Sequence, residues 1–239
     1  MNNLFEAFKE NVLFVVEFLG IVLAFILISY AFEKISKKAN KDKERILSTK
    51  RVVVIGIFSA IATVLYLFDF PVFFAPVFYK LDFSELPCLI GAFAYGPVAG
   101  VLIEFIKVLL KLVIKGTDSA FVGDLANFVI GSSLIVPAAI IYSFSKTKKN
   151  AIFSCVIGTI FITIVGTMFN ALYLLPAFSK LYGMPLDAII GMGSAINASV
   201  KDVWSFVFIC VAPLNLLKGT IISVITVLIY KRISRFLKK

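Results

Sequence analysis

The sequence predicts an all-α fold, a polytopic transmembrane helical bundle. Of the 239 residues, 60% are hydrophobic and only 16% are charged, whereas a soluble domain is about half apolar and about a quarter charged. The mean hydropathy is +1.00. Apolar runs of membrane-spanning length end in clusters of lysine and arginine, as the positive-inside rule expects for helix ends in the cytoplasm. We therefore expect a multi-pass protein of the cell membrane that is embedded in the lipid bilayer.

Seven spans are expected. The first apolar run, 11–32, lacks the cationic start and the small-residue cleavage site of a signal peptide, so we predict a retained helix. The segment 86–95 is too short to cross a bilayer alone at about 1.5 Å per residue, so it is expected to form a short or tilted hairpin with 98–112. The remaining spans are expected at 52–68, 124–144, 151–176 and 203–230.

Three strongly basic segments determine the expected orientation. They are 33–51, 146–149 and 231–239, and the seven-span topology places all three on one side of the membrane. The N-terminus is therefore expected outside the cell and the C-terminus in the cytoplasm. In this topology 69–83 is an external loop that folds back on the bundle, and 177–203 is a polar external loop.

Several functional classes are excluded by residues that the sequence lacks. It has no histidine, which removes the commonest metal ligand and general base and every Ser-His or Cys-His mechanism. We therefore expect neither an enzyme nor a metal site. A Gly-x4-Gly-Lys-Ser/Thr phosphate loop is also missing, so any ATP hydrolysis must take place on another subunit. The basic clusters at span ends account for the net charge of +10, so no binding to nucleic acid is expected.

Three polar residues in the outer halves of two spans are the main candidates for ligand contacts. Asn170 lies near the outer end of one span, and Asn215 and Lys218 have the i, i+3 spacing that places both on one helix face. An amide beside an ammonium provides several donors and one acceptor, which suits the carbonyl and imide edge of a planar heterocycle. Two alternatives stay open: helix–helix bonding for Asn170, and a snorkelling or acid-paired structural role for Lys218.

A second group of charged residues interrupts the apolar sequence in the middle of the chain. Asp82 and Glu85 are expected mainly to cap the helix that begins near Glu85. Glu104, Lys107 and Lys111 follow i, i+3, i+7 spacing, so they are expected to form one charged stripe with an internal acid–base pair. Short, interrupted spans that carry ionisable groups indicate a transporter binding region.

Five motifs together resemble a known family. They are KLDFSELP, AYGPVAGVLIEFIKVLLKLVIKG, GDLANFVIG, NALYLLP and PLNLLKG. Over roughly residues 51–235 the chain resembles the substrate-binding S components of energy-coupling factor (ECF) vitamin transporters. The LDFSELP and YGP pieces are shared by several S components. The Asn-x2-Lys of the last span, with an Asn near the end of the preceding outward span, is similar to the riboflavin-specific branch.

The resemblance implies a six-helix S-component core at 51–239, preceded by an extra N-terminal transmembrane helix and a basic linker at 1–50. It implies that riboflavin is the transported ligand and that no cofactor is needed; whether FMN or analogues also bind stays open. Asn170, Asn215 and Lys218 would contact the isoalloxazine ring, and part of 70–86 would close over the site. The other expected substrate-binding residues, whose aromatic members can stack on a flat ligand, are Tyr79, Asp82, Phe83, Thr117, Asn127 and Tyr173.

The resemblance also implies a transport mechanism and its partners. The S component would capture the vitamin outside, dock on a transmembrane coupling subunit that bears two ATPases, and topple to deliver it inward. Docking in the family uses small residues, often Ala-x3-Ala, on its first helix, and the matching residues here are Gly56-x3-Ala60. The alternatives are an S component for a different vitamin or precursor, and an ion-coupled secondary transporter with Glu104 or Asp124 as the ion site.

Overall fold

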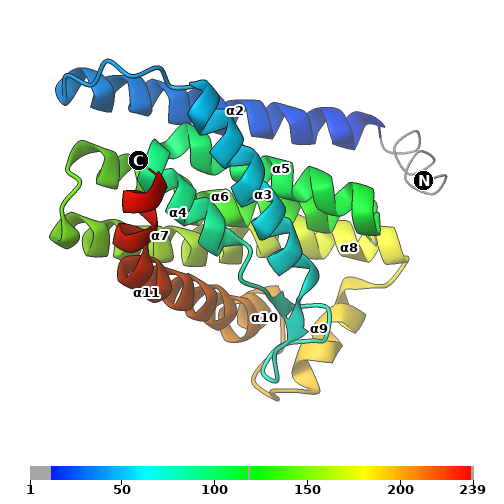
Figure 1. Ribbon diagram of the computed structural model, residues 1–239. Coiled ribbons are helices and arrows are strands. Elements are labelled where there is room, and N and C mark those ends of the chain that lie inside the picture. Colours follow the sequence, from blue (N-terminus) through cyan, green and yellow to red (C-terminus); the bar gives the residue numbers. More distant parts are fainter. Residues whose placement is uncertain (1–11, 118, 238–239) are drawn as a thin grey trace.

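The computed structural model describes residues 12–117 and 119–237, which form a bundle of roughly aligned helices (Figure 1). The long helices are α2 (Val12–Ala39), α3 (Thr49–Leu67), α5 (Pro97–Lys115), α6 (Val122–Phe144), α7 (Lys148–Phe169) and α11 (Ala212–Leu237). The shorter helices are α4 (Glu85–Tyr95), α8 (Leu175–Tyr182), α9 (Leu186–Ser194) and α10 (Val203–Phe206). Two π-helical segments, η1 (Asn170–Leu174) and η2 (Val207–Val211), interrupt the α-helical regions.

Five helical segments of the described chain are long and apolar enough to cross a membrane. They are Phe14–Ala39, Thr49–Leu67, Val122–Phe144, Lys148–Tyr182 and Val203–Arg232. Helix α5 has 19 residues, roughly 28 Å at about 1.5 Å per residue, and so also has the length of a bilayer core. Helix α4 has only 11 residues and reaches about half as far. The predicted hairpin of a short and a longer span is therefore confirmed as α4 and α5.

The packing places α5 and α6 at the centre of the bundle. Helix α3 packs on α5 and α4, α7 packs on α6, and α11 packs on α7 and α4. Helix α2 lies along α5 and α6 (Figure 1). The chain turns between α4 and α5 at Gly96, which has a φ of +106°. Glycine adopts this positive φ at little cost because it has no Cβ. A Cβ at this position would also lie 2.5 Å from Oε2 of Glu33, so the turn requires glycine for two reasons.

The segment between α3 and α4 folds back on the bundle, as predicted. It contains a short antiparallel pair, β1 (Phe70–Pro71) and β2 (Lys80–Leu81), in which Phe70 pairs with Leu81. Ala75 and Leu81 are buried. This folding brings Asp82 into the interior, where α4 begins three residues later.

The prediction that 177–203 forms a polar loop was wrong, because much of this segment is helical. Helix α8 continues to Tyr182, and α9 buries Ile189 and Ile190 in a cluster that also contains Val200 and Phe206. The apolar run at 186–192 forms an amphipathic helix because its hydrophobic side chains have a neighbouring apolar surface to cover. This end of the bundle is therefore a packed layer of short helices.

Candidate functional site

A cavity of about 370 Å³ lies within the bundle, beneath this layer. Its size falls within the usual range for small-molecule sites. Its lining residues come from the segment that folds back between α3 and α4 and from several helical elements, namely α3, α4, α5, α6, η1, α8, η2 and α11. Polar side chains from both halves of the sequence line the cavity, so no single helix forms this site.

Asn170 lies on one wall, at the first residue of η1. Its Nδ2 donates to the carbonyl of Gly166 at 2.7 Å, and its Oδ1 accepts from the hydroxyl of Tyr79 at 2.6 Å. Burial raises the pKa of Tyr79 well above its ordinary value, so this hydroxyl keeps its proton and acts as the donor. Tyr79 thereby connects the folded-back segment to the helix that carries Asn170.

Asn215 lies on the neighbouring helix α11, one turn beyond η2. Its Nδ2 donates to the carbonyl of Val211 at 3.2 Å. A Cβ on Gly166 would lie 2.5 Å from that nitrogen, so the close approach of α7 and α11 depends on a glycine here. Both candidate amides thus adjoin π-helical segments, which are rare and occur frequently at functional sites.

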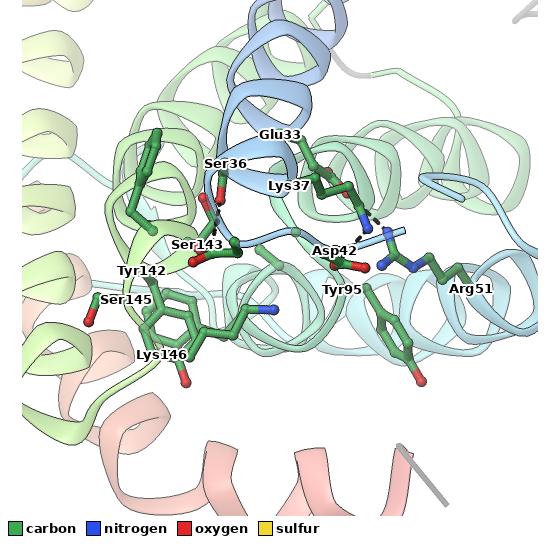
Figure 2. A pocket seen from close by; sticks show the side chains of 15 residues that line it. Glu33, Ser36, Lys37, Asp42, Arg51, Tyr95, Tyr142, Ser143, Ser145 and Lys146 are labelled. Atoms are coloured by element: carbon green, nitrogen blue, oxygen red, sulfur yellow. Dashed lines mark hydrogen bonds and ion pairs between the residues drawn. The ribbon is translucent and has the colours of Figure 1, made fainter. Parts of the chain in front are cut away.

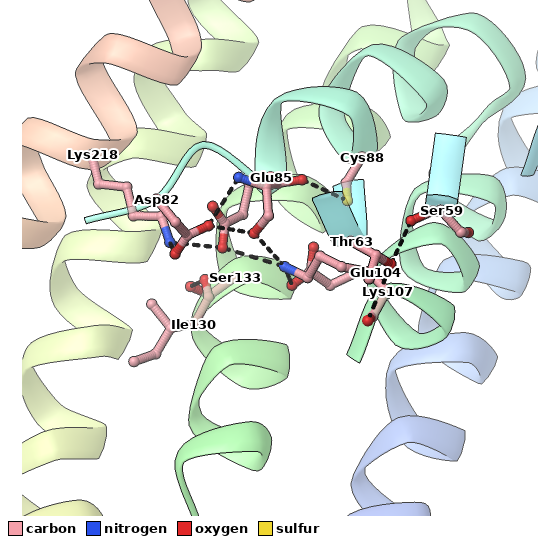
Figure 3. A network of polar contacts seen from close by, with 11 residues as sticks. Ser59, Thr63, Asp82, Glu85, Cys88, Glu104, Lys107, Ile130, Ser133 and Lys218 are labelled. Atoms are coloured by element: carbon pink, nitrogen blue, oxygen red, sulfur yellow. Dashed lines mark hydrogen bonds and ion pairs between the residues drawn. The ribbon is translucent and has the colours of Figure 1, made fainter. Parts of the chain in front are cut away.

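Lys218 is held by two carboxylates from the segment around the start of α4 (Figure 3). Its Nζ lies 3.0 Å from Oδ2 of Asp82 and 2.8 Å from Oε1 of Glu85. Burial alone would raise the pKa of Asp82, but the charges of Lys218 and Lys107 and hydrogen bonds from Ser84 hold it below its ordinary value. The structure therefore shows an acid-paired lysine that also lines the cavity.

The predicted capping role of the two acids was largely wrong. Ser84 is the N-cap residue of α4 and its side chain makes no capping bond. Asp82 accepts from the backbone N–H and the hydroxyl of Ser84, which stabilises the turn before the helix. Glu85 is 1% exposed and forms ion pairs instead. Pairing prevails because a buried carboxylate without a counter-charge costs several kcal/mol.

A second buried lysine extends the ion pairs away from the cavity (Figure 3). Nζ of Lys107 lies 2.5 Å from Oε1 of Glu104 and 3.5 Å from Oε1 of Glu85, and it donates to the Ser84 hydroxyl at 2.9 Å. The predicted pair within the α5 stripe is thus confirmed. Glu85 is shared between Lys107 and Lys218, so it joins α5 to α11 through α4.

The third member of the α5 stripe pairs with a different helix. Nζ of Lys111 lies 2.8 Å from Oδ1 of Asp124, whose Oδ2 accepts from the hydroxyl of Thr117 at 2.8 Å. The same hydroxyl accepts from the backbone N–H of Phe121. The ring of Tyr66 lies 5.1 Å from Nζ of Lys107 and 5.9 Å from that of Lys111, distances at which a cation is attracted to an aromatic face.

The structure brings most of the expected substrate-binding residues to the cavity. Those that line it are Tyr79, Asp82, Asn127, Asn170, Asn215 and Lys218. The other three lie nearby. Phe83 packs on Phe70 with ring centroids 5.9 Å apart, Thr117 acts through Asp124, and Tyr173 stacks on Phe169 at 5.1 Å. Aromatic residues at membrane interfaces commonly serve in packing, so the sequence alone does not distinguish a packing ring from a ring that contacts the ligand.

One buried oxygen in the cavity wall points to a ligand. Oδ1 of Asn127 is buried and has no hydrogen-bond partner among the described residues. A buried acceptor without a hydrogen bond lowers the stability of the fold unless a bound molecule donates a hydrogen bond to it. Four of the other cavity-lining residues carry polar groups that were not predicted to bind the ligand. They are Tyr66, Glu85, Lys111 and Asp124.

The fold and the site can now be compared with known proteins. The family described as "ECF transporter, substrate-specific component" matches residues 50–230. The chain belongs to this family of S components. A solved structure described as "Structure and mechanism of the S component of a bacterial ECF transporter" matches with a TM-score of 0.61 at 36% identity, covering 80% of this chain and 98% of that one.

Two relatives show what members of this family transport. The S component is 36% identical to the riboflavin transporter RibU of Staphylococcus aureus (strain TCH60) over 199 residues, which cover 83% of this chain and 98% of the relative. It is 30% identical to the riboflavin transporter FmnP of Bacillus subtilis (strain 168), covering 81% and 96%. The S component is therefore a multi-pass membrane transport protein and not an enzyme. The family match begins at residue 50, after α2.

Proposed function

We propose that this S component captures riboflavin from the outside and delivers it through an ATP-driven ECF importer. The observation that carries the proposal is the convergence of Asn170, Asn215 and Lys218 on one cavity. The riboflavin transporters among its relatives support the choice of ligand. Riboflavin is here the transported ligand, and no cofactor is proposed.

The chemistry of the cavity suits a flat ring with a polar edge. Amide groups on Asn170 and Asn215 can each donate and accept, and the Lys218 ammonium donates. Together they match the alternating carbonyl and imide groups of an isoalloxazine ring. Elsewhere in the cavity wall, Asn127 offers an acceptor that has no partner among the described residues, and Asp124 offers a carboxylate. We place the hydroxylated chain of riboflavin there.

Docking on the coupling subunit is proposed to use the face of α3 that carries Gly56 and Ala60. Both residues are exposed, and a Cβ built on Gly56 would meet nothing within 4 Å. Packing within this chain therefore gives no reason for a small residue at position 56. A surface of small residues lets another membrane helix approach closely. The proposed partners are one transmembrane coupling subunit and two ATPases.

The proposed orientation puts the start of α2 outside the cell and the end of α11 in the cytoplasm. The segments 33–51 and 146–149 and the C-terminal end of α11 are basic, which the positive-inside rule supports. We propose that residues 51–239 form the substrate-binding unit and that 1–50 form an added helix with its linker.

The first experiment is a visible absorption spectrum of the detergent-purified protein, followed by quenching of riboflavin fluorescence. We expect flavin binding, and we expect Lys218→Ala to weaken it by roughly ten- to a hundredfold because a charged hydrogen bond is worth about 1.5–3 kcal/mol. Lys180→Ala, an exposed lysine outside the cavity, is the matched control. A protein that is colourless and quenches no added riboflavin would leave the fold standing and refute the ligand.

A further inference from the structure

Helix α2 lies outside the family match, yet it is fastened to the S-component core at its inner end. Oε1 of Glu33 lies 2.9 Å from Nη1 of Arg51 on α3 (Figure 2). Oε2 of Glu33 accepts from the backbone N–H of Val98 at 3.1 Å. Glu33 is 3% exposed. Because Val98 is in the first turn of α5, this carboxylate also satisfies a free N–H at a helix start.

The middle of α2 packs on the helix that carries Asn127. Phe18 and Val22 are buried. The ring of Phe18 lies 5.9 Å from that of Phe128, the residue after Asn127, and Phe25 meets the same ring edge-on at 5.7 Å. Helix α2 therefore supports α6 from the side opposite the cavity.

The outer end of α2 reaches the segment that carries Asn170. The ring of Phe14 stacks on Tyr173 with centroids 6.5 Å apart, and Tyr173 stacks on Phe169 at 5.1 Å. These two rings flank Asn170 on either side in the sequence. Phe14 also packs in a small cluster with Ala126 and Leu174, both of which line the cavity. One layer of side chains separates Phe14 from the ligand site.

We propose that α2 braces the substrate site, and that Phe14 is a positioning residue that holds the π-helical segment of Asn170 in place. Asn170 begins a π-helical turn, which is less regular than an α-helix and depends more on its neighbours. With its inner end fixed by Glu33, α2 presents Phe14 to η1 from a rigid support. The identity of the ligand in this inference rests on the proposed function, whereas the contacts of α2 with the core do not depend on it.

The test compares Phe14→Ala with Leu19→Ala, a change on the exposed side of the same helix. Loss of the stacked ring is expected to weaken riboflavin binding by roughly threefold or more, while Leu19→Ala leaves it unchanged. Phe14→Tyr, which keeps the ring, is expected to retain the affinity. On an Asn170→Ala background, Phe14→Ala should cause little further loss, because its effect is exerted through Asn170.

A ligand-free measurement separates this inference from the proposed function. In hydrogen exchange, Phe14→Ala is expected to speed exchange of the amides of 166–178, and Leu19→Ala is not. If wild-type protein binds no riboflavin but this difference is seen, the ligand assignment is wrong and the brace stands. Equal exchange in the two variants, or a loss of binding that adds fully to that of Asn170→Ala, would overturn the brace.

Discussion

Lys218 has a structural role in ion pairs and is also proposed to contact the ligand. Its two carboxylate partners, Asp82 and Glu85, lie 136 and 133 residues earlier in the chain. Together with Glu104 and Lys107 they form a buried network of three acids and two lysines, in which Oε2 of Glu85 and Oε2 of Glu104 have no partner among the described residues. Such a network orients its members as long as each charge keeps a counter-charge.

Replacing Lys107 tests the structural half of this network. Lys107→Met leaves the Glu104 side chain, which is 0% exposed, without its nearest cation. The free energy of unfolding should therefore fall by about 3–5 kcal/mol. The measurement is thermal unfolding in detergent. Lys115→Met, at the exposed end of the same helix, should change the melting temperature little. Similar melting temperatures for the two variants would show that the network contributes little to stability.

At the scale of elements, two π-helical segments position the candidate ligand groups. η1 begins at Asn170, and η2 ends one turn before Asn215. The helices that carry them meet at Gly166, where a side chain would collide with the Asn215 amide. This glycine lets two polar side chains share one wall, and its absence would force α7 and α11 apart or turn the amide away.

Gly166→Ala should therefore weaken riboflavin binding although alanine is the better helix former. We expect a loss of roughly tenfold or more, since displacing one buried amide costs about the value of its hydrogen bonds. Gly20→Ala on α2 is the control, because a Cβ there meets nothing within 4 Å and should leave binding intact while stabilising the helix by up to about 1 kcal/mol. Wild-type affinity in Gly166→Ala would mean that Asn215 is not held as described.

At the scale of the whole molecule, the proposed binding site and the proposed docking face are different surfaces. The cavity lies within the bundle, whereas Gly56 and Ala60 lie on the exposed face of α3. Helix α2 packs on α5 and α6, so it leaves that face of α3 open to another subunit. In the proposed mechanism a second membrane protein can therefore contact the S component from the side without entering the cavity.

Gly56→Leu should separate the two activities. The larger side chain keeps α3 from approaching a partner helix, so vitamin uptake by cells that hold the coupling module should fall at least tenfold, an effect on the order of 1.4 kcal/mol. Quenching of riboflavin fluorescence by the purified variant should match wild type. Ile57→Leu, an exposed neighbour of similar size, should transport normally. If uptake by Gly56→Leu stays normal, docking uses another face.

Local patterns determined much of this protein. The apolar runs and their basic ends predicted the helices, since both reflect only the thickness and polarity of a membrane. The i, i+3 spacing predicted that Asn215 and Lys218 share a face, because a helix has a fixed period. The motif KLDFSELP contains the predicted cavity residue Asp82, and Tyr79 was predicted as an aromatic ring that could stack on a flat ligand.

Only the tertiary structure decided which groups meet. The partners of Lys218 depend on how the segment between α3 and α4 re-enters the bundle, and no local pattern encodes that path. The burial of Ile189 and Ile190 depends on a surface made by residues far along the chain. Phe83 and Tyr173 pack beside the cavity, whereas Tyr79 lines it. The sequence did not distinguish these three aromatic residues, because their roles depend on which neighbouring residues their rings contact in the fold.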